Sequence, residues 1–258
     1  MQRKIHQTEL IPLQPFYSKQ YTVDAQSVDR FGRLRRSTML RYAQEVAGEH
    51  CALISMDHDA LAAKGMFWAV VRNRISVTRL PKKGETITVE TWPMPTTRTA
   101  YPRATAAYDE NGQELFRSVS LWVLMDIRER SMVLPAKSGI TVLGTLRGNE
   151  LAVPRSLAPQ NLSLTQNRYV SFTDLDINGH MNNARYLDWI DDLLPSDFHR
   201  EHQPVEINLC YVNEAREAEL LSVTYQYENQ ELLVDIRRNS GENPSERVFS
   251  ASISYLES

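Results

Sequence analysis

The sequence of 258 residues is poor in cysteine and contains no long apolar run. Its two cysteines, Cys51 and Cys210, each fall in an apolar pattern, so we expect small core residues rather than a disulfide. A membrane span needs about 20 apolar residues in a row, and none is present. The N-terminus also leads into no apolar signal segment. We therefore expect a cytoplasmic protein without a membrane span.

The sequence also lacks a strong excess of either charge. Its net charge of −3 gives no overall electrostatic reason to bind nucleic acid. Two basic clusters are nevertheless present, and any single side chain in them is interpreted first as solvated surface. The clusters comprise Arg30, Arg33, Arg35, Arg36 and Arg41, and Arg72, Arg74, Arg79, Lys82 and Lys83.

Cofactor and metal motifs are missing as well. There is no phosphate-cradling glycine loop and no nucleotide-binding fingerprint. His199 and His202 have metal-like spacing, but they follow Pro195 in an apparent loop without a third ligand nearby. We interpret this pair as surface and expect neither a metal nor a cofactor.

The hydrophobic pattern predicts one order of elements, present twice. After a short strand at 21–23, the first half has a helix from about Ser37 to the low fifties and strands at 67–77, 86–92, 99–108 and 114–126. The second half has a helix at about 183–194 and strands at 204–213, 218–227, 231–238 and 247–255. Each half supplies one long apolar helix to cover its sheet, which favours an α+β fold with an antiparallel sheet wrapped around each helix.

The two halves are separated by a stretch with several prolines and glycines and few aromatic residues. Residues 127–167 are therefore interpreted as a connection, with room for a short helix. The predicted domains are 1–140, a linker region at 141–165, and 166–258.

One stretch concentrates polar groups before the second helix. Asp176, Asn178 and His180 occupy alternate positions, and Gly179 lets the backbone turn because it tolerates positive φ. Asn182 or Asn183 can then cap a helix. This helix would bury the apolar face formed by Ala184, Leu187, Ile190 and Leu194.

An altered copy of this stretch lies earlier in the chain. Residues 28–42 align without gaps on residues 175–189, an offset of 147 (176 − 29). The aspartate and glycine of the turn are kept, but Phe31 stands in place of the asparagine and Arg33 in place of the histidine. We infer a duplicated domain with one chemically equipped half, the alternative being chance similarity between two strand–turn–helix segments.

The equipped stretch suits attack of water on an activated acyl group. It contains an amide to orient water, an imidazole to move a proton, and a carboxylate to hold one of them. Ser171 and Thr173 lie upstream and no thiol is present in the motif, so a covalent mechanism has no evident nucleophile. The alternative is structural, because Asp and Asn before a helix are ordinary turn and cap residues.

The stretch from Asp176 to Trp189 strongly resembles the acyl-acyl carrier protein thioesterases of plants and bacteria. Residues 28–45, 67–72 and 121–125 also resemble that family, so the likeness covers nearly the whole chain. It implies a tandem hotdog fold. It also implies hydrolysis of fatty acyl-acyl carrier protein, which releases free fatty acid and ends elongation in fatty acid biosynthesis. Acyl carrier protein would be the partner, and both a monomer and a homodimer are compatible with a tandem hotdog.

The resemblance also implies catalytic positions. The family's Asp-x-Asn-x-His set falls on Asp176, Asn178 and His180. Its catalytic Glu, found in a Tyr-x-x-Glu context, falls on Glu214, with Tyr211 as the tyrosine. Plant members often have a cysteine after this Glu, but Ala215 stands here, so a cysteine mechanism should not apply. Strict strand alternation puts Glu214 on the face opposite Tyr211. Either the buried face of this strand is that of Cys210 and Val212, or a bulge intervenes.

The remaining expectations concern the substrate. Backbone N–H groups near Gly179 would polarise the thioester carbonyl. The first half would bind the acyl chain through Met39, Met66 and Trp68, and the basic clusters would dock the acidic carrier protein. Two alternatives remain: a hotdog thioesterase acting on acyl-CoA, and a non-catalytic hotdog protein that binds acyl chains.

Overall fold

The computed structural model describes residues 14–148, 151–159, 161–238 and 246–257. The first half contains β1 (Tyr17–Thr22), α1 (Arg36–Leu53), α2 (His58–Ala62), β2 (Met66–Val77), β3 (Thr86–Pro93), β4 (Tyr101–Tyr108), β5 (Glu114–Asp126), β6 (Met132–Val133) and α3 (Pro135–Ser138). The second half contains β7 (Leu164–Tyr169), the short 3-10 helix η1 (Phe172–Asp174), α4 (Arg185–Asp191), α5 (Ser196–Glu201), β8 (His202–Tyr211), β9 (Leu220–Glu228), β10 (Glu231–Arg238) and β11 (Arg247–Glu257).

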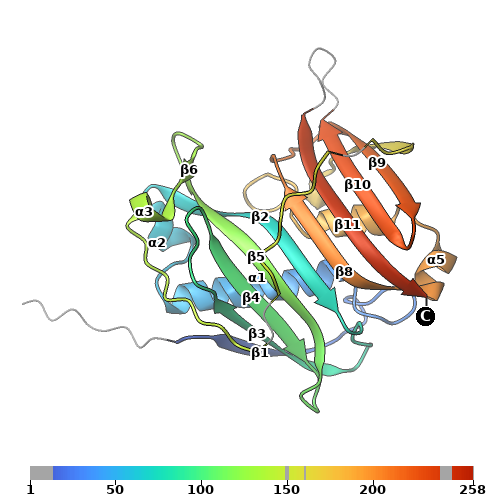
Figure 1. Ribbon diagram of the computed structural model, residues 1–258, viewed down its shortest axis with the longest axis horizontal. Helices are drawn as coiled ribbons and strands as arrows, with labels where there is room; N and C mark the ends of the chain where they lie inside the picture. Colours follow the sequence, from blue (N-terminus) through green and yellow to red (C-terminus); the bar gives the residue numbers. More distant parts are fainter. Residues whose placement is uncertain (1–13, 149–150, 160, 239–245, 258) are drawn as a thin grey trace, which may run out of the picture.

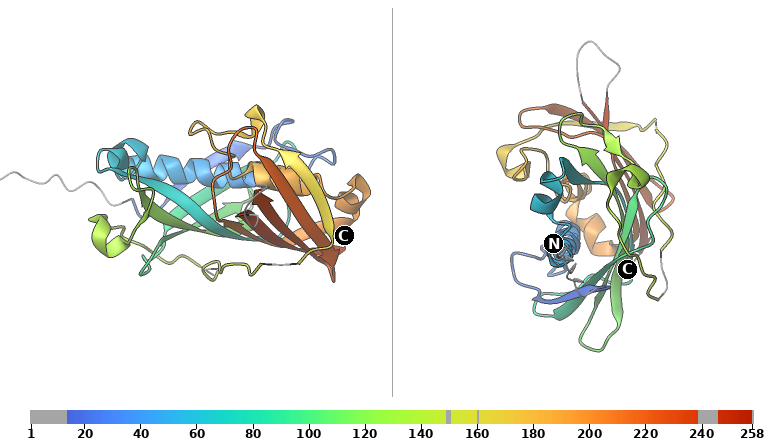
Figure 2. Two further views of the ribbon diagram at one scale, coloured as in Figure 1. Left: turned by 90° about the horizontal axis from the view of Figure 1, so that it is seen from above. Right: turned by 90° about the vertical axis from the view of Figure 1, so that its left-hand side faces the viewer.

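The strands form one continuous antiparallel sheet that runs through both halves (Figure 1). Its order is β1-β3-β4-β5-β2 in the first half and β8-β11-β10-β9-β7 in the second, with β6 paired to β5 off this path. The halves join where β2 pairs with β8, for example at Asn73 opposite Leu209. Outward from this junction, the strands of the two halves follow in equivalent order: β2-β5-β4-β3-β1 on one side and β8-β11-β10-β9-β7 on the other. Helices α1 and α4 lie one after the other along the same face of the sheet (Figure 2).

The strand registers show where the two halves differ in length. The edge pairs Tyr17 with Thr91 and Leu164 with Tyr225 are equivalent. The first members are 147 residues apart (164 − 17) and the second members 134 (225 − 91). Between its first strand and the strand paired with it, the second half is thus 13 residues shorter than the first (147 − 134). Helix α4 has 7 residues where α1 has 18.

One large apolar cluster contains residues of both halves. The inner faces of α1 and α4 contribute Met39, Leu40 and Leu187, and the central strands contribute Ile75 and Ile207. Each of these side chains is at most 2% exposed. Burying one such side chain stabilises the fold by about 1.5–3 kcal/mol, so α1 and α4 are held mainly by this shared core.

Several sequence-based boundaries need correction. The helix expected at 183–194 spans only Arg185–Asp191, and a separate helix, α5, follows Pro195. The expectation of a loop at 199–202 is therefore wrong. Strand β7 lies in the stretch interpreted as a connection, because its mostly exposed polar residues give no apolar alternation. The predicted turn at 239–244 lies outside the described residues. Within the described ranges, no helix is long and apolar enough to span a membrane.

Candidate active site

The turn at Asp176 is built by its own side chain. Asp176 Oδ1 accepts hydrogen bonds from the backbone N–H groups of Asn178 (2.8 Å) and His180 (3.3 Å). Gly179 has a φ of +74° and donates its N–H to the Asp176 carbonyl at 3.0 Å. Asp176 therefore fixes the backbone that presents Asn178 and His180. The Gly179 N–H, expected to polarise a carbonyl, is already used inside the turn.

The N-cap of the helix after the turn, α4, is Ala184, not Asn182 or Asn183 as expected. Ala184 makes no side-chain capping bond. Asn182 instead accepts a hydrogen bond from the Ala184 N–H through its Oδ1 at 2.9 Å, which shapes the approach to the helix. Tyr211 at the end of β8 donates its hydroxyl to the Asn183 carbonyl at 3.1 Å, so the tyrosine ties this approach to the sheet.

A bulge at the end of β8 places Glu214. The N–H groups of Val212 and Asn213 both donate to the Val248 carbonyl, at 2.9 and 3.1 Å, so one extra residue is inserted and strand alternation ends. Glu214 lies beyond the strand, which removes the conflict between its position and that of Tyr211. The Met181 N–H then donates to the carbonyl of the residue after Glu214 at 2.8 Å and brings the two segments together.

The structure brings His180 and Glu214 into direct contact. His180 Nε2 lies 3.1 Å from Glu214 Oε2, with the two side chains 21% and 39% exposed. The other carboxylate oxygen of Glu214, Oε1, is bound by the Arg130 guanidinium, and Arg216 lies 4.0 Å from Oε2. An imidazole and a carboxylate at hydrogen-bond distance can exchange a proton and can together activate a water molecule.

Arg130 was not identified from the sequence. It lies on the hairpin between β5 and β6, 84 residues before Glu214, at a φ of +50°. Asp126 shapes this hairpin by accepting from the N–H groups of Arg128 and Glu129, both at 2.8 Å. Asp126 marks this hairpin in the sequence, but a turn residue does not indicate that Arg130 contacts Glu214 in the second half.

Other predicted groups are not assembled in this structure. Asn178 is exposed, and its amide makes no hydrogen bond to the rest of the described chain. Ser171 and Thr173 are exposed upstream. Cys210 is 5% exposed, and its thiol contacts the Arg155 carbonyl at 3.6 Å. No thiol or hydroxyl therefore contacts the His180 and Glu214 pair among the described residues.

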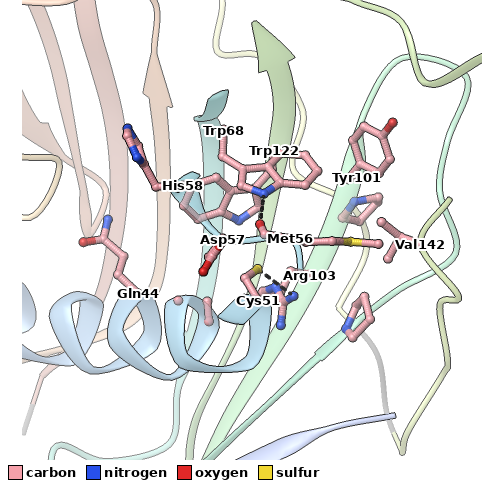
Figure 3. A pocket seen from close by; sticks show the side chains of 14 residues that line it. Gln44, Cys51, Met56, Asp57, His58, Trp68, Tyr101, Arg103, Trp122 and Val142 are labelled. Carbon is pink, nitrogen blue, oxygen red and sulfur yellow. Dashed lines mark hydrogen bonds between the residues drawn. The ribbon is translucent and has the colours of Figure 1, made fainter. Parts of the chain in front are cut away.

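The predicted acyl-binding residues separate into two groups. Trp68 lines a cavity of about 180 Å³ between α1, α2 and strands β2 to β5, and its Nε1 donates to the Met56 carbonyl at 2.9 Å (Figure 3). Met39 and Met66 are 1% and 6% exposed and lie in hydrophobic clusters instead. Cys51, expected in the core, is only partly buried and also lines the cavity.

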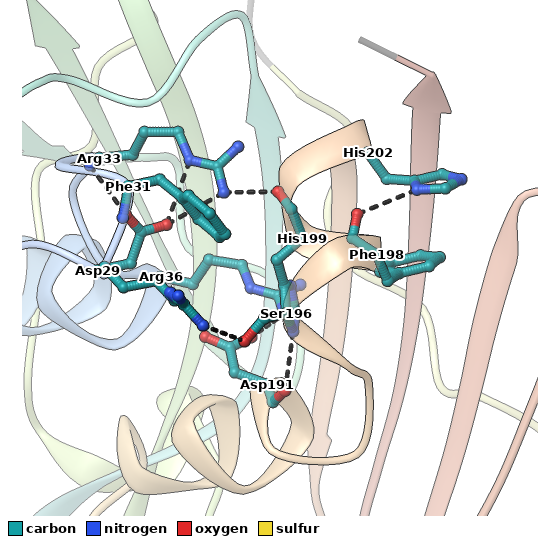
Figure 4. Close-up of polar contacts among 10 residues, drawn as sticks. Asp29, Phe31, Arg33, Arg36, Asp191, Ser196, Phe198, His199 and His202 are labelled. Carbon is teal, nitrogen blue, oxygen red and sulfur yellow. Dashed lines mark hydrogen bonds and ion pairs between the residues drawn. The ribbon is translucent and has the colours of Figure 1, made fainter.

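Most of the first basic cluster is used inside the protein (Figure 4). Arg33 donates to the His199 carbonyl at 2.5 Å, and Arg36 pairs with Asp191. Arg30 donates to Ser196 at 3.0 Å. The first, altered turn is thus covered by the α4–α5 segment of the second half.

The second cluster is partly paired too. Arg74 contacts Glu206 and Arg79 contacts Glu85, each at 2.8 Å. Four exposed cations remain from the two clusters: Arg35, Arg41, Lys82 and Lys83. Among the described residues, no group of three or more His, Cys, Asp or Glu side chains is arranged to hold a metal ion.

Two hotdog units joined at β2 and β8 define a tandem hotdog protein, in which His180 and Glu214 are in contact beside the turn of the second unit. The chain belongs to the acyl-ACP thioesterase family. The family's N-terminal domain matches residues 14–137 and its C-terminal domain matches residues 158–251.

Individual relatives are distant. The chain is 25% identical over 237 residues to a chloroplastic palmitoyl-acyl carrier protein thioesterase from Gossypium hirsutum, covering 86% of this chain and 56% of that protein. A chloroplastic dodecanoyl-[acyl-carrier-protein] hydrolase from Cinnamomum camphora is 26% identical over 191 residues, covering 68% of this chain and 50% of that protein. The chain thus spans about half the length of the curated relatives it matches.

Solved structures show the same fold over nearly the whole chain. An acyl-ACP thioesterase from Bacteroides thetaiotaomicron superposes with a TM-score of 0.83 at 22% identity, covering 94% of this chain and 98% of that one. The 12:0-ACP thioesterase from Umbellularia californica gives 0.79 at 19% identity, with the same coverage. These likenesses confirm the predicted tandem hotdog fold.

Proposed function

We propose that this protein hydrolyses the thioester of fatty acyl-acyl carrier protein with an activated water and releases free fatty acid. The observation that carries this proposal is the contact of His180 Nε2 with Glu214 Oε2 at 3.1 Å. An acid–base pair without an adjacent thiol or hydroxyl favours direct attack by water over an acyl-enzyme. Membership of the acyl-ACP thioesterase family supports the same reaction class.

Each residue of the site has a proposed role. Glu214 takes a proton from water as that water attacks the thioester carbonyl carbon. His180 holds the carboxylate, takes this proton from Glu214 and passes it to the leaving thiolate as the C–S bond breaks. Asn178, which is exposed two residues before His180, orients the water through its amide. Asp176 acts indirectly by fixing the turn.

Arg130 positions the carboxylate of Glu214. Its guanidinium binds the oxygen that does not face His180, so the lone pairs directed at the imidazole and the water remain in place. Because Arg130 comes from the first half, the proposed active site needs both hotdog units.

The first half is proposed to bind the acyl chain, with the chemistry in the second. The cavity lined by Trp68 supports this division, whereas the burial of Met39 and Met66 gives their predicted role no support. The domain bounds at 1–140 and 166–258 belong to the same proposal. The acidic carrier protein would dock on the cations that remain exposed, such as Lys82 and Lys83. A cytoplasmic location remains part of the proposal.

A hydrolysis assay on acyl-carrier protein and acyl-CoA across chain lengths tests the function. Fast release from carrier protein that is lost in Glu214→Gln would support the proposed reaction and base. Faster hydrolysis of acyl-CoA would replace the carrier protein as substrate. Tight acyl binding without hydrolysis of either thioester would overturn the proposal in favour of a binding protein.

A further inference from the structure

The cavity of the first half has mostly apolar walls, with a buried positive charge at one corner and Asp57 among its other lining residues (Figure 3). Its walls include Met56, Trp68, Tyr101 and Trp122. The volume of about 180 Å³ exceeds the roughly 150 Å³ of an apolar cavity that holds benzene. It therefore suits an aliphatic segment of about six to eight carbons. Arg103, which comes from β4 and is 7% exposed, supplies the charge.

Among the described residues, the side chains that hydrogen-bond to the Arg103 guanidinium are neutral. Nη1 donates to His50 Nδ1 at 3.0 Å and to Thr91 at 3.3 Å, and Nη2 donates to the Cys51 thiol at 3.5 Å. His50 Nε2 lies 2.8 Å from the carbonyl oxygen of Gln14. A carbonyl can only accept, so Nε2 carries the proton and Nδ1 accepts from Arg103. Burial lowers the pKa of His50, which keeps the ring neutral.

Arg103 differs from the other buried arginines in lacking a carboxylate. Arg36 and Arg117 are 4% and 6% exposed; Arg36 pairs with Asp191, and Arg117 with Glu114. Among the residues that the structure describes, no carboxylate oxygen lies within 4.0 Å of the Arg103 guanidinium. An unpaired buried charge is costly, so this corner of the cavity favours an anion.

Neither Asp57 nor the end of α1 supplies a full negative charge that pairs with Arg103. Asp57 lines the cavity, but its carboxylate caps α2 by accepting from the Ala60 N–H at 3.0 Å. The C-terminal end of α1 offers only a partial negative charge. A guanidinium has five N–H donors, of which three contact His50, Thr91 and Cys51. Nε–H and one Nη2–H therefore remain for a ligand, and this is the pair of nitrogens that can bind a carboxylate through two bonds.

We propose that this cavity binds an aliphatic carboxylate, with the chain between Trp68 and Trp122 and the carboxylate on Arg103. Two sources share this chemistry: a free fatty acid, and an acyl group whose far end carries a carboxylate. The choice between these sources rests on the proposed function, since the first is its product and the second a substrate class. Carboxylate binding itself does not depend on hydrolysis.

Calorimetric titration of the full chain carrying Glu214→Gln measures binding without turnover. Sodium octanoate should bind at least about tenfold more tightly than 1-octanol, because a charged hydrogen bond contributes about 1.5–3 kcal/mol. Arg103→Met should abolish this difference, while Arg98→Met, at an exposed arginine between β3 and β4, should keep it. Equal affinity for octanoate and octanol with Arg103 intact would overturn the proposal, even if Arg103→Met failed to fold.

Assays of the active protein separate the two sources. A preference for ω-carboxyoctanoyl- over octanoyl-carrier protein that Arg103→Met removes would assign the carboxylate to the substrate. Competitive inhibition by octanoate that Arg103→Met removes, without such a preference, would assign it to the product. Octanoate binding through Arg103 in a protein that hydrolyses no thioester would refute the proposed reaction and leave this site standing.

Discussion

The turns that begin at Asp29 and Asp176 have the same backbone and different surroundings. In each, the aspartate Oδ1 accepts from the N–H groups two and four residues later, at 2.8 and 3.0 Å in the first turn and 2.8 and 3.3 Å in the second. Gly32 and Gly179 each have a φ of +74°. The duplication therefore extends to individual hydrogen bonds, although only the second turn carries the acid–base pair.

The strand bulges beside the two turns also match. In the first half, two successive N–H groups donate to the Leu115 carbonyl at 2.9 and 3.1 Å, as two do to the Val248 carbonyl in the second half. The next residue is Leu80 in the first half and Glu214 in the second. Leu80 is 9% exposed and belongs to the core. The same backbone position thus holds a packing residue in one half and the proposed base in the other.

The two turns share their backbone and differ in a few side chains, and we propose that these side chains decide the chemistry. The first turn is covered by α5, whose His199 carbonyl accepts from Arg33. The second turn stays partly open, and Glu214 beside it pairs with Arg130 from the opposite half. One turn thus serves the junction between halves and the other serves the proposed reaction.

The difference between the two halves should be most evident when Glu214 is replaced, since Leu80 occupies the equivalent position in the first half. Glu214→Gln should lower kcat by about 10²–10⁴-fold, the usual contribution of a general acid or base. The unfolding midpoint should hardly change, because the side chain is 39% exposed. Steady-state hydrolysis of acyl-carrier protein measures the effect. Glu217→Gln, at an exposed carboxylate nearby, is the matched control, and equal turnover in both variants would remove Glu214 from the reaction.

The packing of α1 against α4 beside the first turn is tested at an ion pair between the two helices. Arg36 and Asp191 have side chains 5% and 31% exposed. Asp191→Asn leaves the Arg36 charge buried; such losses cost about 3–5 kcal/mol, and the partial exposure of Asp191 favours the lower end. Urea unfolding should show this loss, with turnover retained at low temperature. Asp192→Asn, at a side chain 62% exposed, should cost less than about 1 kcal/mol; a similar loss in both would contradict the assignment.

A smaller effect is expected at Arg130, the residue that the first half contributes to the second turn. Arg130 and Glu214 are 47% and 39% exposed, and exposed pairs contribute up to about 1 kcal/mol. Arg130→Gln should therefore lower kcat by up to about fivefold, and the difference from wild type should shrink in high salt. Arg128→Gln on the same exposed hairpin is the control. A salt-independent loss would indicate that Arg130 does not act through its charge.

Local patterns were enough to predict much of this arrangement. Alternation and turn residues placed the long strands, and the matched Asp and Gly positions revealed the duplicated turn. The resemblance to the thioesterase family pointed to Glu214, which the structure then brings to His180. Each of these signals lies within a few residues of chain, where spacing alone fixes which side chains share a face.

The features that were missed depend on long-range contacts. Arg130 reaches Glu214 across 84 residues, and no local pattern encodes that approach. Arg103 lies in a strand of small residues buried on both faces, so alternation could not show that it faces a cavity. Strand β7 is a polar edge strand defined by its pairing with β9. Tertiary pairing, rather than local preference, decided each of these outcomes.

A pH dependence is expected at α5, which covers the first turn. Burial, together with the charges of Arg36 and Arg33, lowers the pKa of His199 to about 4 from its ordinary value of 6.5. Unfolding restores the ordinary value, so the unfolded chain binds an extra proton between about pH 4 and 6.5. Stability from this group is therefore complete above pH 6.5 and is lost as the pH falls toward 4.

His199→Gln cannot titrate, so the free-energy difference between wild type and variant should shift by up to about 2.5 kcal/mol between pH 7.5 and 4.5. Wild type should lose the stability, and urea unfolding at the two pH values measures it. His58→Gln, at a ring 72% exposed, should lose stability in parallel with wild type. If His199→Gln also lost stability in parallel with wild type, burial of His199 against the first turn would not lower its pKa.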